Sequence, residues 1–84
     1  MNVLLIEDNE SIVSGLKYSL EQEKYKVFSC TNVADTIKFL EENKQVDIAI
    51  IDISLPDGNG FDLYQNYIKE KNIPSIFLTA RDSE

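Results

Sequence analysis

Three acidic residues stand directly after two short apolar runs. Glu7 and Asp8 follow residues 3–6, and Asp52 follows residues 48–51. Carboxylates held close together raise one another's pKa, whereas a hard divalent cation with oxygen ligands neutralises them. Mg²⁺ usually takes one or two carboxylates and keeps further positions for water and phosphate oxygens. If the two runs are neighbouring strands, the three acids predict a magnesium site suited to a phosphoryl group.

Asp52 is the predicted nucleophile of this site. A carboxylate can accept a phosphoryl group in line while a metal offsets the charge on the phosphoryl oxygens. Asp52 follows a continuous apolar run and opens an irregular loop, whereas Glu7 and Asp8 form a pair suited to the metal. Each acid taken alone is more often a solvated strand end or a helix cap, so the site is inferred from their combination.

Two further features belong to the same edge of the predicted sheet. The loop at residues 55–60, Leu-Pro-Asp-Gly-Asn-Gly, places Pro second and Gly fourth, as in a type I turn. Turn chemistry alone is a sufficient explanation for that loop. Thr79, followed by the small Ala80, ends the apolar run at residues 76–78, and its hydroxyl could donate to a phosphoryl oxygen. A lone threonine in such a place is more often structural.

Four apolar runs predict the strands that position these residues. Residues 3–6 and 48–51 are rich in branched side chains and read as central strands buried on both faces. Residues 25–30 mix polar and apolar side chains, which suits an edge strand. Residues 76–78 form a fourth strand after Pro74, which is tolerated near a strand's first residue.

Apolar residues at helical spacing predict a helix in each interval between the strands. The three sets are Ile12, Leu16 and Leu20; Val33, Ile37 and Leu40; and Phe61, Tyr64 and Ile68. Asn9, Asn32 and Asn59 stand where the helix N-caps are needed. Strands that alternate with helices of about a dozen residues predict right-handed crossovers and a parallel α/β sheet.

The composition sets the class of protein. A chain of 84 residues has room for one small domain, and a net charge of −7 argues against binding to nucleic acid. Cys30 is the sole cysteine, so no internal disulfide is possible, and it reads as a small core residue. Without a basic leader or a long hydrophobic segment, we expect a cytoplasmic protein that has no membrane partner.

Three segments together resemble the receiver domains of bacterial two-component response regulators. They are residues 3–9 (Val-Leu-Leu-Ile-Glu-Asp-Asn), residues 50–60 (Ile-Ile-Asp-Ile-Ser-Leu-Pro-Asp-Gly-Asn-Gly) and residues 76–80 (Ile-Phe-Leu-Thr-Ala). The resemblance extends over residues 1–84, as the N-terminal portion of one receiver domain. It implies a flavodoxin-like doubly wound parallel sheet of strand order 2-1-3-4, with the fifth strand and the last helices absent.

The same resemblance assigns roles to individual residues. Asp52 would be the phosphoacceptor, and Thr79 the switch hydroxyl. Glu7 and Asp8 would hold Mg²⁺ together with Asp52, and the backbone carbonyl of Ser54 would complete the protein ligands. The phosphate-contacting lysine and the aromatic switch residue of the family lie in the absent segment, so no residue here takes those roles.

The resemblance also implies partners. A sensor histidine kinase would phosphorylate Asp52, and the domain would act as a switch that assists its own phosphorylation and dephosphorylation, not as an enzyme. The segment from Leu55 to Leu63 is similar to regulators that carry a winged-helix DNA-binding domain, so the parent protein is expected to regulate transcription through a domain absent here. Without a fifth strand, residues 76–78 would form an exposed apolar edge, which favours a homodimer or a strand-pairing oligomer.

Alternative functions remain open. The first is an interaction module of receiver shape that works without phosphorylation. The second is a metal-dependent phosphatase with an aspartyl nucleophile. It is disfavoured because such enzymes usually keep an acid two residues after the nucleophile, where this chain has Ser54. P-loop and dinucleotide-binding sites lack support because no glycine-rich cradle follows the first or third strand.

Overall fold

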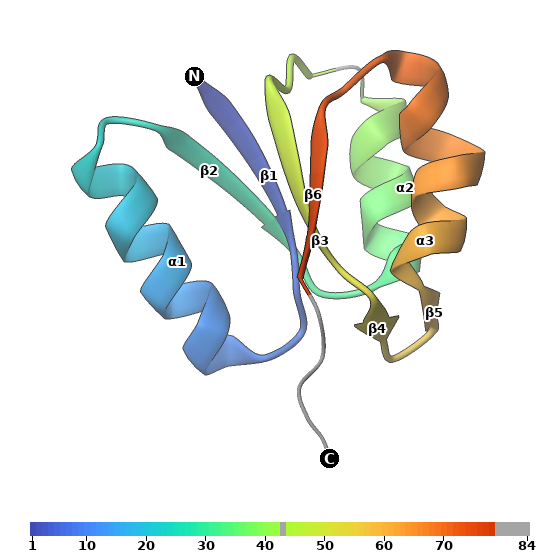
Figure 1. The fold of residues 1–84 in the computed structure, drawn as a ribbon, viewed down its shortest axis with the longest axis horizontal. Helices are drawn as coiled ribbons and strands as arrows, with labels where there is room; N and C mark the ends of the chain where they lie inside the picture. Colours follow the sequence, from blue (N-terminus) through green and yellow to red (C-terminus); the bar gives the residue numbers. More distant parts are fainter. Residues whose placement is uncertain (43, 79–84) are drawn as a thin grey trace.

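The computed structural model describes residues 1–42 and 44–78, which form a parallel sheet with helices on both faces (Figure 1). The strands of this sheet are β1 (Asn2–Ile6), β2 (Lys26–Cys30), β3 (Ile48–Asp52) and β6 (Ser75–Leu78). Their spatial order is β2-β1-β3-β6, with every pair parallel. The predicted order 2-1-3-4 is confirmed, and the more polar β2 lies at one edge as expected.

The helices lie on opposite sides of the sheet. Figure 1 shows α1 (Glu10–Gln22) on one side and α2 (Val33–Glu41) with α3 (Gly60–Leu63) on the other. The third helical segment continues as a π-helix, η1 (Tyr64–Ile68), and then as a 3₁₀ turn, η2 (Lys69–Lys71). None of the helices within the described part of the chain has the length and apolarity needed to cross a membrane.

A small antiparallel hairpin follows β3, and the sequence did not predict it. Its strands are β4 (Ser54–Leu55) and β5 (Gly58–Asn59), joined by the two-residue turn Pro56-Asp57. Pro56 was correctly assigned to the turn, and Gly58, expected as the fourth residue of the turn, begins β5 directly after it. Two-residue strands are too short to give a periodic hydrophobic pattern, so the pairing on either side of the turn had no signal of its own.

Both faces of the central strands are buried, because side chains of one strand alternate between them. Val3 and Leu5 pack in the cluster that includes residues of α1. Leu4 and Ile6 pack in the cluster on the other face, beside α2 and α3. None of these four side chains is more than 1% exposed. This double burial is the physical reason for the uninterrupted apolar run at the start of the chain.

The predicted apolar face of α1 was wrong at one position. Ile12 is 43% exposed, and Val13 packs with Leu16 and Leu20 against the sheet instead. Spacings of three and then four residues follow the 3.6-residue helical period, whereas two successive spacings of four drift away from one face. The set in α2 is confirmed, since Val33, Ile37 and Leu40 all belong to its core cluster.

The set predicted for the third helix is confirmed for its two later members. Tyr64 and Ile68 pack in the same core cluster as α2. Phe61 is 48% exposed, yet its ring lies 4.6 Å from that of Phe77 in β6. This aromatic contact ties the start of α3 to the last strand of the sheet.

Asparagine caps begin the three helices, as predicted. The side-chain oxygens of Asn9 and Asn59 each accept two backbone N–H groups of the following turn, and that of Asn32 accepts one. Cys30 is buried at the end of β2, and this burial raises the pKa of its thiol. It is the core residue that the sequence indicated.

The burial difference between two isoleucines gives a matched test of the fold. Ile68→Ala should lower the free energy of unfolding by about 2–5 kcal/mol, because Ile68 is 0% exposed and its loss leaves a cavity. Ile12→Ala should change that free energy by less than about 0.5 kcal/mol. Urea denaturation followed by circular dichroism measures both. Equal losses in the two variants would contradict the packing described for α1 and η1.

Candidate functional site

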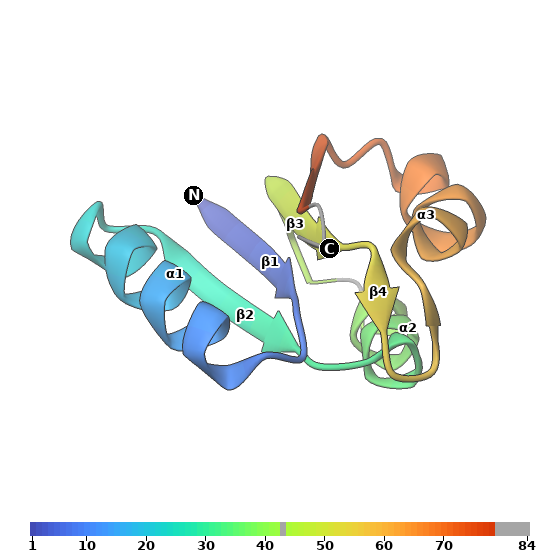
Figure 2. The same cartoon turned by 60° about the horizontal axis from the view of Figure 1, so that its bottom comes forward.

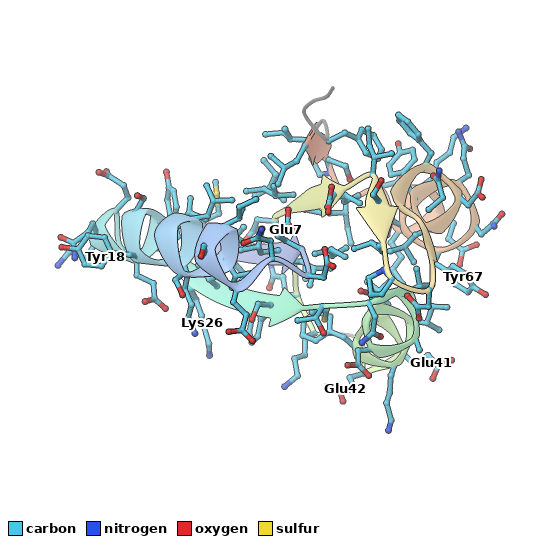
Figure 3. The ribbon with its side chains drawn as sticks, turned by 90° about the horizontal axis from the view of Figure 1, so that it is seen from below. Glu7, Tyr18, Lys26, Glu41, Glu42 and Tyr67 are labelled. Atoms are coloured by element: carbon cyan, nitrogen blue, oxygen red, sulfur yellow. The ribbon has the colours of Figure 1, made fainter. Side chains whose placement is uncertain are left out.

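The three predicted acids meet at the carboxyl edge of the sheet. Strands β1 and β3 are adjacent, with Ile6 opposite Ile51, so the residues that follow them emerge side by side. Carboxylate oxygens of Glu7, Asp8 and Asp52 all lie within 4.8 Å of one another. Figure 3 looks onto this edge and shows Glu7 between α1 and the β4–β5 hairpin. The structure therefore brings Asp52 beside Glu7 and Asp8, which are far from it in the sequence.

Two of these acids are buried, which makes their mutual repulsion costly. Glu7 is 3% exposed and Asp52 is 9% exposed, whereas Asp8 faces solvent. Burial raises the pKa of Glu7. The negative charge of Asp52, and a hydrogen bond between the two carboxyl groups, raise the pKa of Glu7 further. The Asn9 backbone N–H donates to the Glu7 carboxylate at 3.0 Å and partly offsets these effects. The edge carries an excess of negative charge that a cation would relieve.

The donor set fits Mg²⁺. All three groups offer oxygen ligands, and the exposed Asp8 leaves the site open to the water that magnesium retains. Within residues 1–42 and 44–78, none of the three carboxylates forms a salt bridge, so protein cations do not compensate them there. A divalent ion at this edge would supply that charge and orient a phosphoryl oxygen.

The loop after β3 positions Asp52. The Ser54 backbone N–H donates weakly to the Asp52 carboxylate at 3.4 Å, and the Gly60 N–H donates to the Ile53 carbonyl at 2.8 Å. Ser54, whose carbonyl is the expected metal ligand, is exposed at the start of β4. Thr79, the expected switch hydroxyl, lies outside the described residues.

Gly60 is required by the close approach of α3 to β3. A Cβ atom at Gly60 would collide with the Asp52 carbonyl oxygen and would lie 2.9 Å from the Ile51 side chain. Gly60 is buried at this contact. The absence of a side chain therefore lets the start of α3 rest against the backbone that carries Asp52.

Asp57 has a role that the sequence did not reveal. It lies at the tip of the hairpin, and its two carboxylate oxygens accept the backbone N–H groups of Val33 at 2.7 Å and Ala34 at 3.0 Å. Figure 2 shows the loop between β4 and β5 beside α2. These hydrogen bonds lower the pKa of Asp57. The residues are 23 and 24 positions apart, and no local pattern connects such distant segments.

Comparison with solved structures defines the class of protein. The chain superposes on the non-phosphorylated receiver domain of HemR from Leptospira biflexa with a TM-score of 0.83 and 39% identity, covering 99% of this chain and 67% of that one. It superposes on the MaeR response regulator bound to beryllium trifluoride with a TM-score of 0.83 and 27% identity, covering 99% and 70%. The fold is that of an α/β receiver module.

Sequence comparison identifies the family. Residues 3–84 match the response regulator receiver domain. The chain is 37% identical over 83 residues to the heme response regulator HssR of Staphylococcus epidermidis, which covers 99% of this chain and 37% of that protein. This chain belongs to the receiver domain family of two-component response regulators, and it spans little more than a third of the length of that relative.

Two glycines provide a matched test of the backbone contact at the site. Gly60→Ala should lower the free energy of unfolding by about 1–3 kcal/mol, because its methyl group has no space beside Asp52. Gly15→Ala, in the exposed middle of α1 with nothing within 4 Å of the new atom, should raise stability by about 0.5–1 kcal/mol. Chemical denaturation measures both changes. A Gly60→Ala variant as stable as Gly15→Ala would refute the close approach.

The hydrogen bonds of Asp57 predict a pH-dependent contribution to stability. Its folded pKa lies below the unfolded value, so the stabilisation is complete above the ordinary aspartate pKa of about 3.9 and is lost as pH falls through the lower folded pKa. Asp57→Ala should therefore have a lower Tm than the parent at neutral pH, and the difference should shrink towards about pH 3. Thermal unfolding followed by circular dichroism at several pH values checks this. A difference in Tm that is constant across the range would count against an ionic interaction.

Proposed function

We propose that residues 1–84 form the N-terminal portion of a receiver domain that acts as a phosphorylation switch, with Asp52 as the phosphoacceptor. The observation that carries the proposal is the meeting of Glu7, Asp8 and Asp52 within 4.8 Å at the carboxyl edge of a receiver fold. Ligands of open parallel α/β sheets bind at this edge, outside the carboxyl ends of the strands. The acceptor is thus a buried carboxylate beside two others that can hold a metal.

Magnesium is the cofactor that this donor set fits. Glu7, Asp8 and Asp52 would bind it directly or through water, and the Ser54 backbone carbonyl would add a fourth oxygen. When bound, the ion offsets charge on the transferred phosphoryl group. The burial of Glu7 and Asp52 supports this role, since none of the three carboxylates forms a salt bridge among the described residues.

A sensor histidine kinase is the proposed phosphoryl donor. The phosphorus–nitrogen bond of its phosphohistidine breaks as a bond forms between phosphorus and an Asp52 carboxylate oxygen, and the electron pair leaves with the imidazole nitrogen. Asp52 occupies the end of β3, where the Ser54 N–H donates to its carboxylate and the Gly60 N–H donates to the carbonyl of the next residue, Ile53. The related MaeR response regulator is bound to beryllium trifluoride, whose beryllium becomes tetrahedral, like the phosphorus of a phosphoryl group, once an oxygen coordinates it; this supports phosphate chemistry in this family.

The switch operates within a longer parent protein. Response regulators pass the state of the receiver to an output region, and the matched relative is nearly three times as long as this chain. We propose that phosphorylated Asp52 shifts a two-state surface of the receiver that controls a DNA-binding output and thereby transcription. The receiver segment itself, with a net charge of −7, does not contact nucleic acid.

Strand β6 supports a partner at the sheet edge. It forms the edge of the described sheet, and Ile76 within it is 52% exposed. An unpaired apolar edge strand pairs readily with another strand. We therefore predict that this segment forms a homodimer or a strand-pairing oligomer through β6.

Phosphorylation can be tested by intact mass. Folded protein is incubated with Mg²⁺ and a small-molecule phosphoryl donor such as a phosphoramidate, and its mass is compared with that of Asp52→Asn and of a sample with excess chelator. We expect a single phosphoryl adduct, which is absent in both controls. Asp62→Asn, which removes an exposed acid outside the cluster, should keep the adduct.

Each outcome separates the candidate functions. An adduct retained in Asp52→Asn would place the acceptor elsewhere. No adduct on folded wild-type protein would favour an interaction module of receiver shape that works without phosphorylation. Release of inorganic phosphate with many turnovers would point to a phosphatase.

A further inference from the structure

The β4–β5 hairpin is fastened to α2 at its tip. Both oxygens of Asp57 are used, one on the Val33 N–H and one on the Ala34 N–H. Beside this contact, a Cβ atom at Gly58 would lie 2.9 Å from the Val33 side chain, so the hairpin backbone lies directly against the helix. A carboxylate is also favoured at a helix N-terminus by the helix dipole.

The helix does not need Asp57 in order to begin. Its own N-cap, Asn32, accepts the Asp35 N–H at 2.7 Å, and the Asn32 carbonyl accepts the Thr36 N–H at 3.2 Å. The first-turn N–H groups that Asn32 leaves free are those of Val33 and Ala34. Asp57 receives this remaining pair, so the contact serves the hairpin as well as the helix.

The other end of the hairpin is joined to the acidic site. Strand β4 begins two residues after Asp52, and Leu55 within it is buried in the core. Strand β5 leads into Gly60, which rests against the Asp52 carbonyl. The segment between Asp52 and α3 is therefore fixed at its base by the core and at its tip by Asp57.

We propose that Asp57 is a positioning residue for the acceptor site, which holds the Asp52–Ser54 backbone in its metal-binding geometry by clamping the hairpin to α2. This inference rests on the proposed Mg²⁺ and phosphoryl chemistry at Asp52. Asp57 itself does not touch the metal or the phosphoryl group. Without the two hydrogen bonds between Asp57 and α2, the Ser54 carbonyl and the Asp52 carboxylate sample more orientations. Binding of Mg²⁺ must then restrict these orientations, which lowers the affinity.

The test compares three variants that weaken the same region differently. Asp57→Ala removes both hydrogen bonds to α2, and Asp57→Asn keeps one acceptor oxygen. Asn32→Ala removes the helix's own cap and leaves the hairpin clamp intact, so it controls for a merely structural loss in α2. The readouts are the dissociation constant for Mg²⁺, followed by NMR on the Ser54 and Gly60 amides, and the phosphorylation rate at limiting and saturating Mg²⁺.

We expect Asp57→Ala to weaken Mg²⁺ binding on the order of tenfold, the lower end of the effect of removing a group that orients metal ligands. Asp57→Asn should lie between this variant and the wild type. The phosphorylation rate of Asp57→Ala should fall at limiting Mg²⁺ and recover largely at saturation. Asn32→Ala should bind Mg²⁺ as the wild type does, although it is less stable.

Two results would overturn the proposal: wild-type Mg²⁺ affinity in folded Asp57→Ala, or an equal loss of affinity in Asn32→Ala. If Asp57→Ala does not fold, Asp57→Asn and Gly58→Ala, which pushes the hairpin away from Val33, carry the same comparison. Failure of the wild type to accept a phosphoryl group would refute the proposed function. The Mg²⁺ affinities would still decide the role of Asp57.

Discussion

The constraint on which the rest of the structure depends is the forced proximity of buried negative charges. Pairing of β1 with β3 brings Glu7 and Asp52 together, and neither strand can move apart without breaking the centre of the sheet. Isolated buried carboxylates are costly, so the fold must provide either a cation or a shared proton at this edge. A domain of this size has little stability to spare. An ion that binds only the folded chain therefore also stabilises the fold itself.

The surrounding backbone is arranged around that edge. Asn9 supports Glu7 through its N–H and then caps α1, while Gly60 lets α3 approach the carbonyl of Asp52. The β4–β5 hairpin, which follows Asp52, reaches the start of α2 through Asp57. Three helix N-termini and one turn thus converge on the end of the sheet where the acids lie. Such helix ends and turns supply backbone N–H groups near a site of excess negative charge.

Much of this arrangement could be predicted from the sequence because its determinants are local. Runs of branched apolar residues that end in acids predicted the central strands, and the asparagine N-caps predicted where the helices begin. The strand order came from the family resemblance together with the polar character of β2. Ile12 was wrongly predicted to face the sheet. Residues spaced by four follow one face of a helix for only about two turns and then drift off it. Asp57 was missed because its partners are fixed by tertiary packing, which no spacing in the sequence encodes.

The contact between Asp57 and α2 also has a consequence for how such domains can be recombined. Residues 57–58 and residues 32–34 form one structural unit, because an acid at the hairpin tip meets free N–H groups and a glycine meets the Val33 side chain. A chimaera that takes the hairpin from one receiver and α2 from another separates these partners. Crossover points placed between α2 and β3, or within β3, would break the match, whereas exchange of the whole block from residue 31 to residue 60 would keep it.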